Sequence, residues 1–389
     1  MDGNRARRMR VLEPMGGYNR AAMPAEVNSG LEGVVAAETT ISLVDGQAGR
    51  LLYRGYEIGD LASHGSYDRV VGLLLDGEWP ADDEVLPVAE LDSTVLAALR
   101  GLPTSCAPLD ALRTGVSAFG AERRFGWPPT PDQARQLIAL GPAVVGAFAR
   151  LRDGKRPVDS SEGADLGVAG RLLHAISGEQ PDPAQARALD AYFTVCAEHG
   201  LNASTFTARV ITSTQSDLAS AVCGAVGALK GRLHGGAPSE VRDQLTQIGD
   251  VDHAEVWIRE ALARGERLMG FGHRVYKTMD PRAAALRQVA ERLAADADWL
   301  QLAIDVEDVA LRLLAEHKPD RPLKTNVEYY ASIVLDGVGL LTDLYTPAFA
   351  VARTAGWTAH ALEQAAHGRL IRPDSRYVGA APRSLATPA

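Results

Sequence analysis

Cysteine is scarce in this sequence. Only Cys106, Cys196 and Cys223 occur among its 389 residues, and no two of them have CxxC spacing. An odd and sparse set of this kind argues against a disulfide framework and against a zinc site, and it is typical of free thiols in a reducing compartment. We therefore expect a cytoplasmic protein without a metal site.

Long hydrophobic runs and an excess of positive charge are also missing. The most apolar stretch of small residues, 218–229, has 12 residues, whereas a membrane-spanning helix needs about 20. The 40 Lys and Arg residues are outnumbered by 49 Asp and Glu residues, which gives a net charge of −9. A protein that binds nucleic acid by neutralising phosphates should be basic. We expect neither a membrane nor a nucleic acid as a partner.

Several common catalytic motifs are absent. The sequence has no HExxH and no GxSxG, and the GFG at 270–272 lacks the third glycine of a dinucleotide-binding fingerprint. The glycines and the lysine of 224–231 do not have the spacing of a P-loop. These absences disfavour NAD-dependent, ATP-dependent and serine-hydrolase chemistry.

Helical patterns dominate the sequence. With 46% hydrophobic and 23% charged residues the composition is that of a globular protein, and the length allows about two or three domains. Small residues on nearly every side of 203–230 predict a closely packed central helix. The predicted helices are 67–76, 90–99, 109–119, 132–152, 164–177, 183–199, 203–230, 252–264, 281–296, 300–316, 327–340 and 347–367.

Clear strand signals occur only in residues 31–56, where β-branched runs flank the turn-forming pair Asp45-Gly46. This pattern predicts a hairpin. Residues 1–28 are rich in arginine and have no apolar periodicity, so we expect a flexible arm there. A transit peptide is the alternative, although no apolar signal core is present. The predicted fold class is mainly α with a small N-terminal β-hairpin.

Five segments contain the side chains best suited to chemistry. Four of them combine turn-forming glycines with titratable residues, and the fifth is rich in arginine. They are 198–205, 231–238, 270–282, 325–330 and 347–376. Glycine allows close backbone approach, so His234 and His273, which stand beside glycines, are expected at turns. Taken singly, each has a simpler explanation, because such a histidine is more often a capping residue and a helical arginine is more often solvated.

Together these segments resemble the citrate synthase family, in its shorter bacterial form, and the closely related 2-methylcitrate synthases. The resemblance extends from about Gly30 to Gly379. It is carried by GLEGVVAAET, DGQAGRLLYRGY, EHGLNASTFTARV, LHGGAP, GFGHRVYKTMDPRA, TNVEYYASIVL and FAVARTAGWTAH. It implies a helical homodimer with a large domain (29–234 plus 334–389), a small domain (235–333) and an active site in the cleft between them.

The resemblance also implies a reaction, in which a carbon of an acyl-CoA adds to the keto carbon of oxaloacetate and the thioester is then hydrolysed. Glu328 matches the catalytic base, His234 the hydrogen-bond donor to the thioester carbonyl, and His273 the residue that polarises the oxaloacetate carbonyl. A carboxylate with a pKa of about 4.3 is a weak base for a carbon acid, so the enolate oxygen must be stabilised. A neutral His234 suits that role, because a backbone carbonyl can hold its other nitrogen and fix the tautomer.

Oxaloacetate carries two carboxylates, and the resemblance assigns cationic side chains to them. His199, Arg282 and Arg353 match oxaloacetate-binding positions. Arg372 matches an arginine that crosses from the neighbouring subunit. Guanidinium groups pair with carboxylates bidentately, and each charge-assisted bond contributes about 1.5–3 kcal/mol.

Two short windows are positive although the chain is acidic. Residues 273–287 and 318–324 are each rich in Lys and Arg with a single Asp. We assign Lys277, Arg321 and Lys324 to the phosphates of CoA. The implied reaction needs no metal and no redox cofactor, and acetyl-CoA enters as a substrate.

The sequence departs from the family pattern at two positions. The base is normally an aspartate in an NVD motif, and here it is Glu328, which adds a carbon–carbon bond of about 1.5 Å. We expect Glu328 to remain the base in a slightly altered cleft. The second departure is Cys196, where the family often has histidine. It is either an inert buried thiol or a change that alters keto-acid affinity.

Four interpretations remain open. The first is citrate synthase acting on acetyl-CoA, which we favour, and the second is 2-methylcitrate synthase acting on propionyl-CoA. One methylene in an apolar pocket is worth only about 1–3 kcal/mol, so activity on both is compatible with either. The third is a regulatory paralogue that binds CoA or oxaloacetate with little catalysis, supported only by Glu328. The fourth, a helical scaffold without a small-molecule site, conflicts with the histidine–glycine segments.

Overall fold

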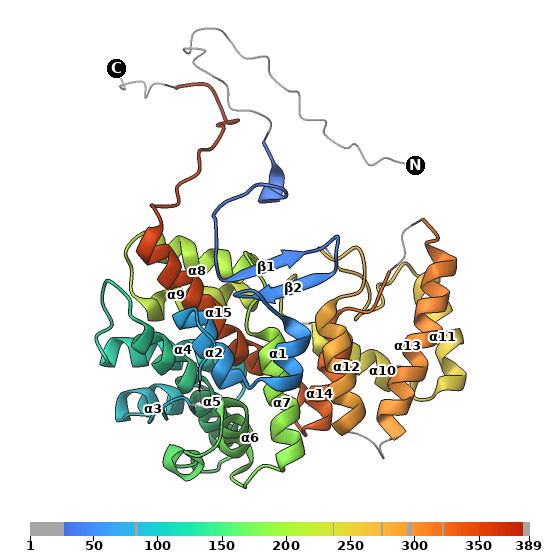
Figure 1. Ribbon diagram of the computed structural model, residues 1–389, viewed down its shortest axis with the longest axis horizontal. Coiled ribbons are helices and arrows are strands. Elements are labelled where there is room, and N and C mark those ends of the chain that lie inside the picture. The colour runs from blue at the N-terminus through green and yellow to red at the C-terminus, as the bar shows by residue number, and fades with distance from the viewer. Residues whose placement is uncertain are drawn as a thin grey trace, which may run out of the picture. The chain divides into compact units, whose positions relative to one another are not determined.

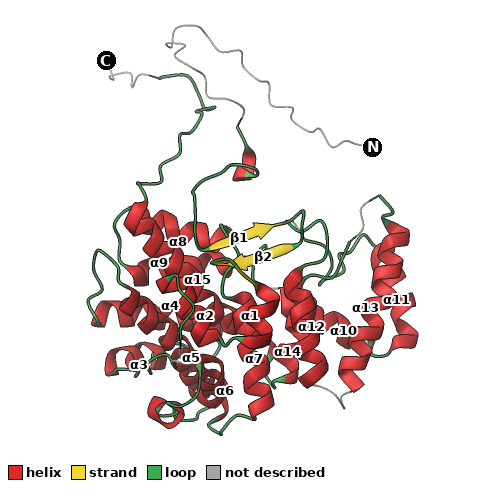
Figure 2. Cartoon of the chain, viewed as in Figure 1, coloured by secondary structure: helices red, strands yellow, loops and turns green. Residues whose placement is uncertain are grey.

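The described residues are predominantly helical (Figure 1 and Figure 2). The computed structural model describes residues 27–81, 85–235, 237–273, 275–293, 298–320 and 323–383. This part of the chain contains 15 α-helices and one three-stranded sheet, which confirms the predicted mainly α class. Residues 1–26 of the predicted arm lie outside the described residues.

The helices follow one another from the hairpin to the C-terminal segment. The first seven are α1 (Ile58–His64), α2 (Tyr67–Asp76), α3 (Ser93–Arg100), α4 (Pro108–Glu122), α5 (Pro131–Arg152), α6 (Val168–Ser177) and α7 (Pro183–Cys196). The others are α8 (Ala203–Ser213), α9 (Leu218–Leu229), α10 (Ala237–Ile248), α11 (Val251–Ala263), α12 (Pro281–Leu293), α13 (Asp298–His317), α14 (Val327–Gly337) and α15 (Tyr345–His367).

The predicted hairpin is present. Strands β1 (Ser42–Asp45) and β2 (Arg50–Tyr53) pair antiparallel, and the short β3 (Tyr56–Glu57) adds to β2. The Asp45 carboxylate accepts hydrogen bonds from the backbone amides of Gln47 and Ala48 at 2.9 Å, which stabilises the turn. The strands begin at residue 42, later than the 31–56 pattern indicated.

Capping residues explain why several predicted helices begin where they do. Thr130 and Gln133 form a reciprocal capping box before α5, with Pro131 in the first turn. The Asp182 side chain accepts from two backbone amides at the start of α7, which Pro183 opens. Asn326 caps α14 in the same way and so sets the position of Glu328 in its first turn.

The prediction of one helix over 203–230 was wrong. Gln215 has a positive φ of 66°, which ends α8 and turns the chain. Asp217 then accepts from the amide of Ser220 and starts α9. The small residues of both helices still pack closely, because α8 and α9 lie against each other and against α15. The sequence patterns also missed α1 and α10. Pro238 lies in the first turn of α10, where proline is tolerated.

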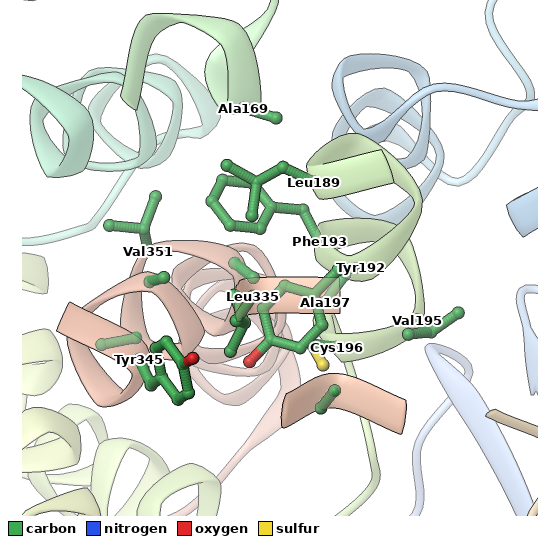
Figure 3. Packing of buried hydrophobic residues seen from close by; sticks show 14 of the residues in the cluster. Ala169, Leu189, Tyr192, Phe193, Val195, Cys196, Ala197, Leu335, Tyr345 and Val351 are labelled. Carbon is green, nitrogen blue, oxygen red and sulfur yellow. The ribbon is translucent and has the colours of Figure 1, made fainter. Parts of the chain in front are cut away.

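Helix α15 runs through the core and carries Arg353. Nearly its whole length is buried, and it packs on α2, α4, α5, α7, α8 and α9. Figure 3 shows part of this packing, with Leu189 and Phe193 of α7, Leu335 of α14 and Val351 of α15. The same helices carry Arg353 and, at the end of α7, Cys196, so the core packing fixes the backbone around both residues.

The chain divides into two compact units, Met1–Glu38 and Thr39–Ala389. The described part of the first, residues 27–38, contains one short 3-10 turn at Ser29–Leu31. The second holds the sheet and all the α-helices. Among the described residues, none of the helices combines the length and the hydropathy that a membrane span requires.

Candidate active site

Two loop segments that are far apart in the sequence run side by side at the site. Phe271 and Thr325 form an isolated antiparallel bridge. Asn326 donates its backbone amide to Gly270 at 2.9 Å and its side-chain amide to the carbonyl of Gly272 at 2.8 Å. The glycine-flanked loop before His273 is therefore held directly against the start of α14.

A buried ion pair extends this arrangement. The Arg282 guanidinium donates from Nε and Nη2 to the two oxygens of Asp280 at 3.0 and 2.8 Å, and the side chains are 5% and 1% exposed. Asp280 Oδ2 also accepts from the amide of Val327 at 3.1 Å. Burial would lower the pKa of Arg282, but the charge and hydrogen bonds of Asp280 outweigh it and raise this pKa. Arg282 is thus a permanent cation fixed to the first turn of α14.

His273 is held as a neutral hydrogen-bond donor. Its Nδ1 accepts from the backbone amides of Val275 and Tyr276, both at 3.0 Å. The two amides at 3.0 Å outweigh the contact between Nε2 and Nη2 of Arg282, which at 3.5 Å is at the limit of a hydrogen bond, so we assign the proton to Nε2. Burial, and then the charge of Arg282, lower the pKa of His273 to about 4. The Nε2–H group is therefore available to a ligand oxygen at neutral pH.

His199 lies against His273. Their ring centroids are 5.6 Å apart in an edge-to-face arrangement, and Nε2 of His199 lies 3.1 Å from the hydroxyl of Tyr276. Burial, followed by the charges of Arg282, Arg353 and His273, holds the pKa of His199 well below its usual value. It is neutral, so it contributes hydrogen bonding and not charge.

Arg353 is a buried cation without a carboxylate partner among the described residues. It is 2% exposed, its Nε donates to the carbonyl of Cys196 at 2.5 Å, and its guanidinium carbon lies 4.6 Å from the centre of the Phe349 ring. Its Nη groups make no hydrogen bond to any described residue. A buried guanidinium in this state strongly favours an anionic ligand.

His234 is oriented by a serine hydroxyl that contacts its Nε2. Ser204 Oγ lies 2.8 Å from His234 Nε2 and 2.7 Å from Asn202 Oδ1, and it accepts from Trp357 Nε1 at 3.1 Å. Ser204 donates to Asn202 Oδ1 in this arrangement, but that oxygen already accepts two backbone amides at the start of α8, and the hydroxyl can turn its one proton to His234 Nε2 instead. The imidazole then carries its proton on Nδ1, and this nitrogen can donate to a ligand. Burial, and then the charge of Arg353, lower the pKa of His234.

Glu328 lies in the first turn of α14 and is half-buried. Its carboxylate makes no hydrogen bond to any described residue. Burial raises its pKa from 4.5 to about 7, although the charges of Arg282 and Arg353 pull in the opposite direction. An unpaired carboxyl group with a pKa near neutrality is the arrangement that a general base requires.

The predicted CoA contacts lie beside His273. Lys277 and Lys324, both exposed, line a cavity of about 180 Å³ together with His273, Tyr276 and Leu323. Arg321, the third predicted contact, lies outside the described residues. No group of three His, Cys, Asp or Glu side chains in the described part of the chain could hold a metal ion.

One predicted site residue is not near the others in the single chain. Arg372 is exposed in the extended segment that follows α15, and it forms no hydrogen bond or ion pair with a described residue. The prediction placed it in the neighbouring subunit's site, which a single chain does not test.

Sequence reasoning missed four residues that hold the site together. Asp280 anchors Arg282, Tyr276 contacts His199, and Ser204 with Trp357 orients His234. All four occur in the quoted segments, but no spacing rule connects Ser204 with Trp357, because the two residues are 153 positions apart in the sequence. The DPR triplet at 280–282 was the available signal, since an Asp two residues before an Arg at a helix start can cap the helix and pair with the arginine.

We expect Glu328→Gln to gain stability relative to the wild type as the pH rises. The folded protein holds a proton on Glu328 between its reference pKa of 4.5 and its folded pKa of about 7. A group whose pKa is raised by folding stabilises the folded protein at pH values below that range. This contribution to the unfolding free energy is lost as the pH rises through 7. Glutamine does not titrate, so the difference in unfolding free energy should grow by at most about 3 kcal/mol between about pH 4.5 and pH 8. Urea unfolding at several pH values measures it, and a pH-independent difference would contradict the raised pKa.

The comparisons with known proteins agree on one family. The family model described as "Citrate synthase, C-terminal domain" matches residues 30–374. A citrate synthase of Haloferax volcanii is 41% identical over 376 residues, which is 92% of this chain and 97% of the relative. A 2-methylcitrate synthase of Mycobacterium tuberculosis is 40% identical over 372 residues, 92% of each chain.

Solved structures lead to the same family. The citrate synthase of Thermotoga maritima is 32% identical, with a TM-score of 0.80, and the match covers 93% of this chain and 98% of that one. The citrate synthase of Thermoplasma acidophilum, solved with carboxymethyl coenzyme A and oxaloacetate, is 30% identical with a TM-score of 0.83 and the same coverage. Long sequence matches and a shared fold both support one conclusion: the chain belongs to the citrate synthase family.

Proposed function

We propose that this protein is an acyl-CoA:oxaloacetate condensing enzyme of the citrate synthase type, which converts acetyl-CoA, oxaloacetate and water to citrate and CoA. One observation carries the proposal. Three histidines with lowered pKa values and a carboxyl group with a pKa of about 7 all lie within the electrostatic influence of two buried guanidinium groups, Arg282 and Arg353. Family membership supplies the reaction class, and the side-chain geometry supports the individual roles below.

Glu328 is the base that removes a proton from the acyl carbon in this proposal. A pKa of about 7 makes its carboxylate a stronger base than an ordinary glutamate while leaving a large part of it ionised at neutral pH. His234 donates from Nδ1 to the thioester oxygen, which becomes negative in the enolate. A preorganised donor of this kind is worth about 2.7–4 kcal/mol.

Oxaloacetate is bound by the cationic side of the site. Arg353, which lacks a carboxylate partner among the described residues, takes one substrate carboxylate, and Arg282 with His199 contributes to binding the other groups. His273 donates its Nε2–H to the keto oxygen and so makes the keto carbon more electrophilic. Lys277 and Lys324 bind the phosphates of CoA at the rim of the cavity, and Arg321 is proposed with them from the sequence alone.

The acyl group is the main alternative within this reaction. Relatives named citrate synthase and 2-methylcitrate synthase are equally similar to the chain, at 41% and 40% identity. The longer side chain of Glu328 reaches further toward the thioester, which favours the smaller acetyl group. Propionyl-CoA, giving 2-methylcitrate, is therefore the second candidate.

The proposed catalytic cycle uses two domains and two subunits. The large domain consists of 29–234 plus 334–389 and the small domain of 235–333, and closing the cleft between them excludes water from the enolate. In the proposed homodimer, Arg372 of each chain completes the site of its neighbour. The three free thiols suit a reducing compartment, and we propose a cytoplasmic location.

We expect the wild type to release CoA from acetyl-CoA only when oxaloacetate is present, and to act more slowly on propionyl-CoA. Glu328→Gln should lower kcat by about 10²–10⁴, because it removes the base. Glu328→Asp keeps the carboxylate but moves it by about 1.5 Å, so a loss of about 10²-fold or less is expected. Thiol release with each acyl-CoA measures all three proteins.

Three results would each overturn a part of this proposal. If Glu328→Gln kept most of the wild-type kcat, Glu328 would not be the base. If the wild type released no CoA while oxaloacetate or CoA still raised its melting temperature, the protein would be a binding paralogue and not an enzyme. If neither ligand changed the melting temperature, the small-molecule site itself would be wrong.

Mixed dimers test the proposed role of Arg372. Homodimers of Arg372→Ala and of Glu328→Gln should each be nearly inactive. In a mixed dimer one site receives both an intact Glu328 and the neighbour's intact Arg372. Equal co-expression should therefore restore roughly a quarter of the wild-type activity, since half of the dimers are mixed and each has one complete site. Absence of any recovery, with mixed dimers shown by mass spectrometry, would place Arg372 in its own chain's site, and an active Arg372→Ala homodimer would place it outside both sites.

A further inference from the structure

The backbone between α7 and α8 is held at almost every residue. Tyr53 of the hairpin donates to the carbonyl of Glu198 at 2.8 Å and accepts from its amide at 3.1 Å. The carbonyl of Cys196 accepts from Arg353, and that of Ala197 accepts from the amide of Gly356 at 3.0 Å. This segment carries His199, so its rigidity determines where that imidazole lies relative to Arg353.

The side chain of Glu198 is the centre of this arrangement. It is fully buried, and its Oε1 accepts from the hydroxyl of Ser42 at 2.9 Å, from Nε2 of His360 at 3.1 Å and from the amide of Gly200. Its Oε2 is buried and has no hydrogen-bond partner within the described part of the chain. Burying a carboxylate is costly unless it is paired and hydrogen-bonded, so its presence beside the site requires an explanation.

A chain of contacts, which we call the relay, connects Glu198 through His360 and Arg209 to Glu363. His360, also fully buried, lies with Nδ1 2.8 Å from Nη1 of Arg209, and Arg209 pairs with Glu363 at 2.8 Å. Because an arginine can only donate, Nδ1 of His360 is the acceptor and its proton is on Nε2, directed at Glu198. Glu363 in turn accepts from the amide of Thr40 at 2.9 Å, next to the hairpin. The relay therefore joins α8, α15 and the hairpin around one carboxylate.

The relay also explains why Arg353 is free to bind a ligand. A carboxylate next to a buried arginine would normally pair with it, as Asp280 pairs with Arg282. The Oε1 of Glu198 is instead occupied by His360, Ser42 and Gly200, and Oε2 lies against Gly356 of α15 without a hydrogen bond to Arg353. Glu198 thus balances the charge of Arg353 through space, while the Nη groups of Arg353 keep their hydrogen-bonding capacity. The charge of Arg353 is among the causes that lower the pKa of Glu198 against the effect of burial.

We propose that Glu198 and His360 are positioning residues for the keto-acid substrate: their buried hydrogen bond fixes His199 and keeps the guanidinium of Arg353 unpaired. This inference rests on the proposed function, because it takes oxaloacetate as the ligand of both residues. It requires that loss of the relay weaken oxaloacetate binding and leave acyl-CoA binding, which depends on the Lys277 cavity, nearly unchanged.

Glu198→Gln is the main test, with Asp68→Asn as a matched control. Asp68 is likewise a buried carboxylate that holds two backbone amides, those of Leu86 and Val168, and it contacts none of the site residues. We expect Glu198→Gln to raise the KM for oxaloacetate about tenfold or more, since small misplacements of binding groups have effects of this size. The KM for acetyl-CoA should stay within about twofold. Asp68→Asn should lower the melting temperature and change neither KM.

His360 variants separate positioning from simple destabilisation. His360→Leu should produce the same change in the KM for oxaloacetate. His360→Gln, whose amide can still donate to Glu198, should recover most of the wild-type value. If Glu198→Gln does not fold, Ser42→Ala removes a single bond to the same oxygen, and it should raise the KM for oxaloacetate by about threefold, as expected for loss of one hydrogen bond.

The outcomes distinguish this inference from the proposed function. If the wild type neither binds oxaloacetate nor releases CoA in its presence, the proposed function fails. If the wild type is active and the Glu198 and His360 variants lose only thermal stability, with both KM values unchanged, the relay is purely structural and the inference is wrong. An equal rise in both KM values would also contradict it.

Discussion

The site depends on two guanidinium groups that are buried in different ways. Arg282 forms an ion pair with Asp280, whereas Arg353 is 2% exposed and has no carboxylate partner among the described residues. An unpaired buried ion carries a penalty of several kcal/mol, which Glu198 reduces through space and which a directly bound anionic ligand can relieve further. Together with burial, the field of these two cations lowers the pKa of His199 and keeps it neutral. Positive charge is thereby concentrated on the two guanidinium groups.

The charges of the same two arginines also affect the pKa of Glu328. Burial raises the pKa of this carboxyl group to about 7, and the two arginines prevent a larger rise. A base with a pKa near the working pH combines proton affinity with a substantial ionised fraction. His234 and His273 complement it, because each is neutral and each has one nitrogen occupied by the protein. Their remaining N–H groups can donate to two different oxygens without a change of protonation state.

Local signals predicted much of the fold and only part of the site. Prolines and capping residues such as Asp182 and Thr130 determine where helices begin, and these signals lie within a few residues. The break at Gln215 escaped prediction because α8 and α9 have the same small-residue composition on both sides of it. The family motifs brought His199, His273, Arg282, Arg353 and Glu328 to attention, and the structure brings these side chains together. The contacts that orient them, such as Ser204 with Trp357 or Glu198 with His360, join segments about 150 residues apart, and a single sequence contains no local trace of such pairs.

A crystal structure with oxaloacetate bound would test most directly whether the unpaired guanidinium of Arg353 binds the keto acid. We expect one substrate carboxylate to lie within hydrogen-bonding distance of the Nη groups of Arg353, and the keto oxygen to lie within that distance of Nε2 of His273. We also expect that Glu198 remains bonded to His360 and does not move to Arg353. Two results would show that an unpaired buried guanidinium does not create the keto-acid site. The first is oxaloacetate bound at another place. The second is an Arg353 that pairs with Glu198 while the substrate contacts neither residue.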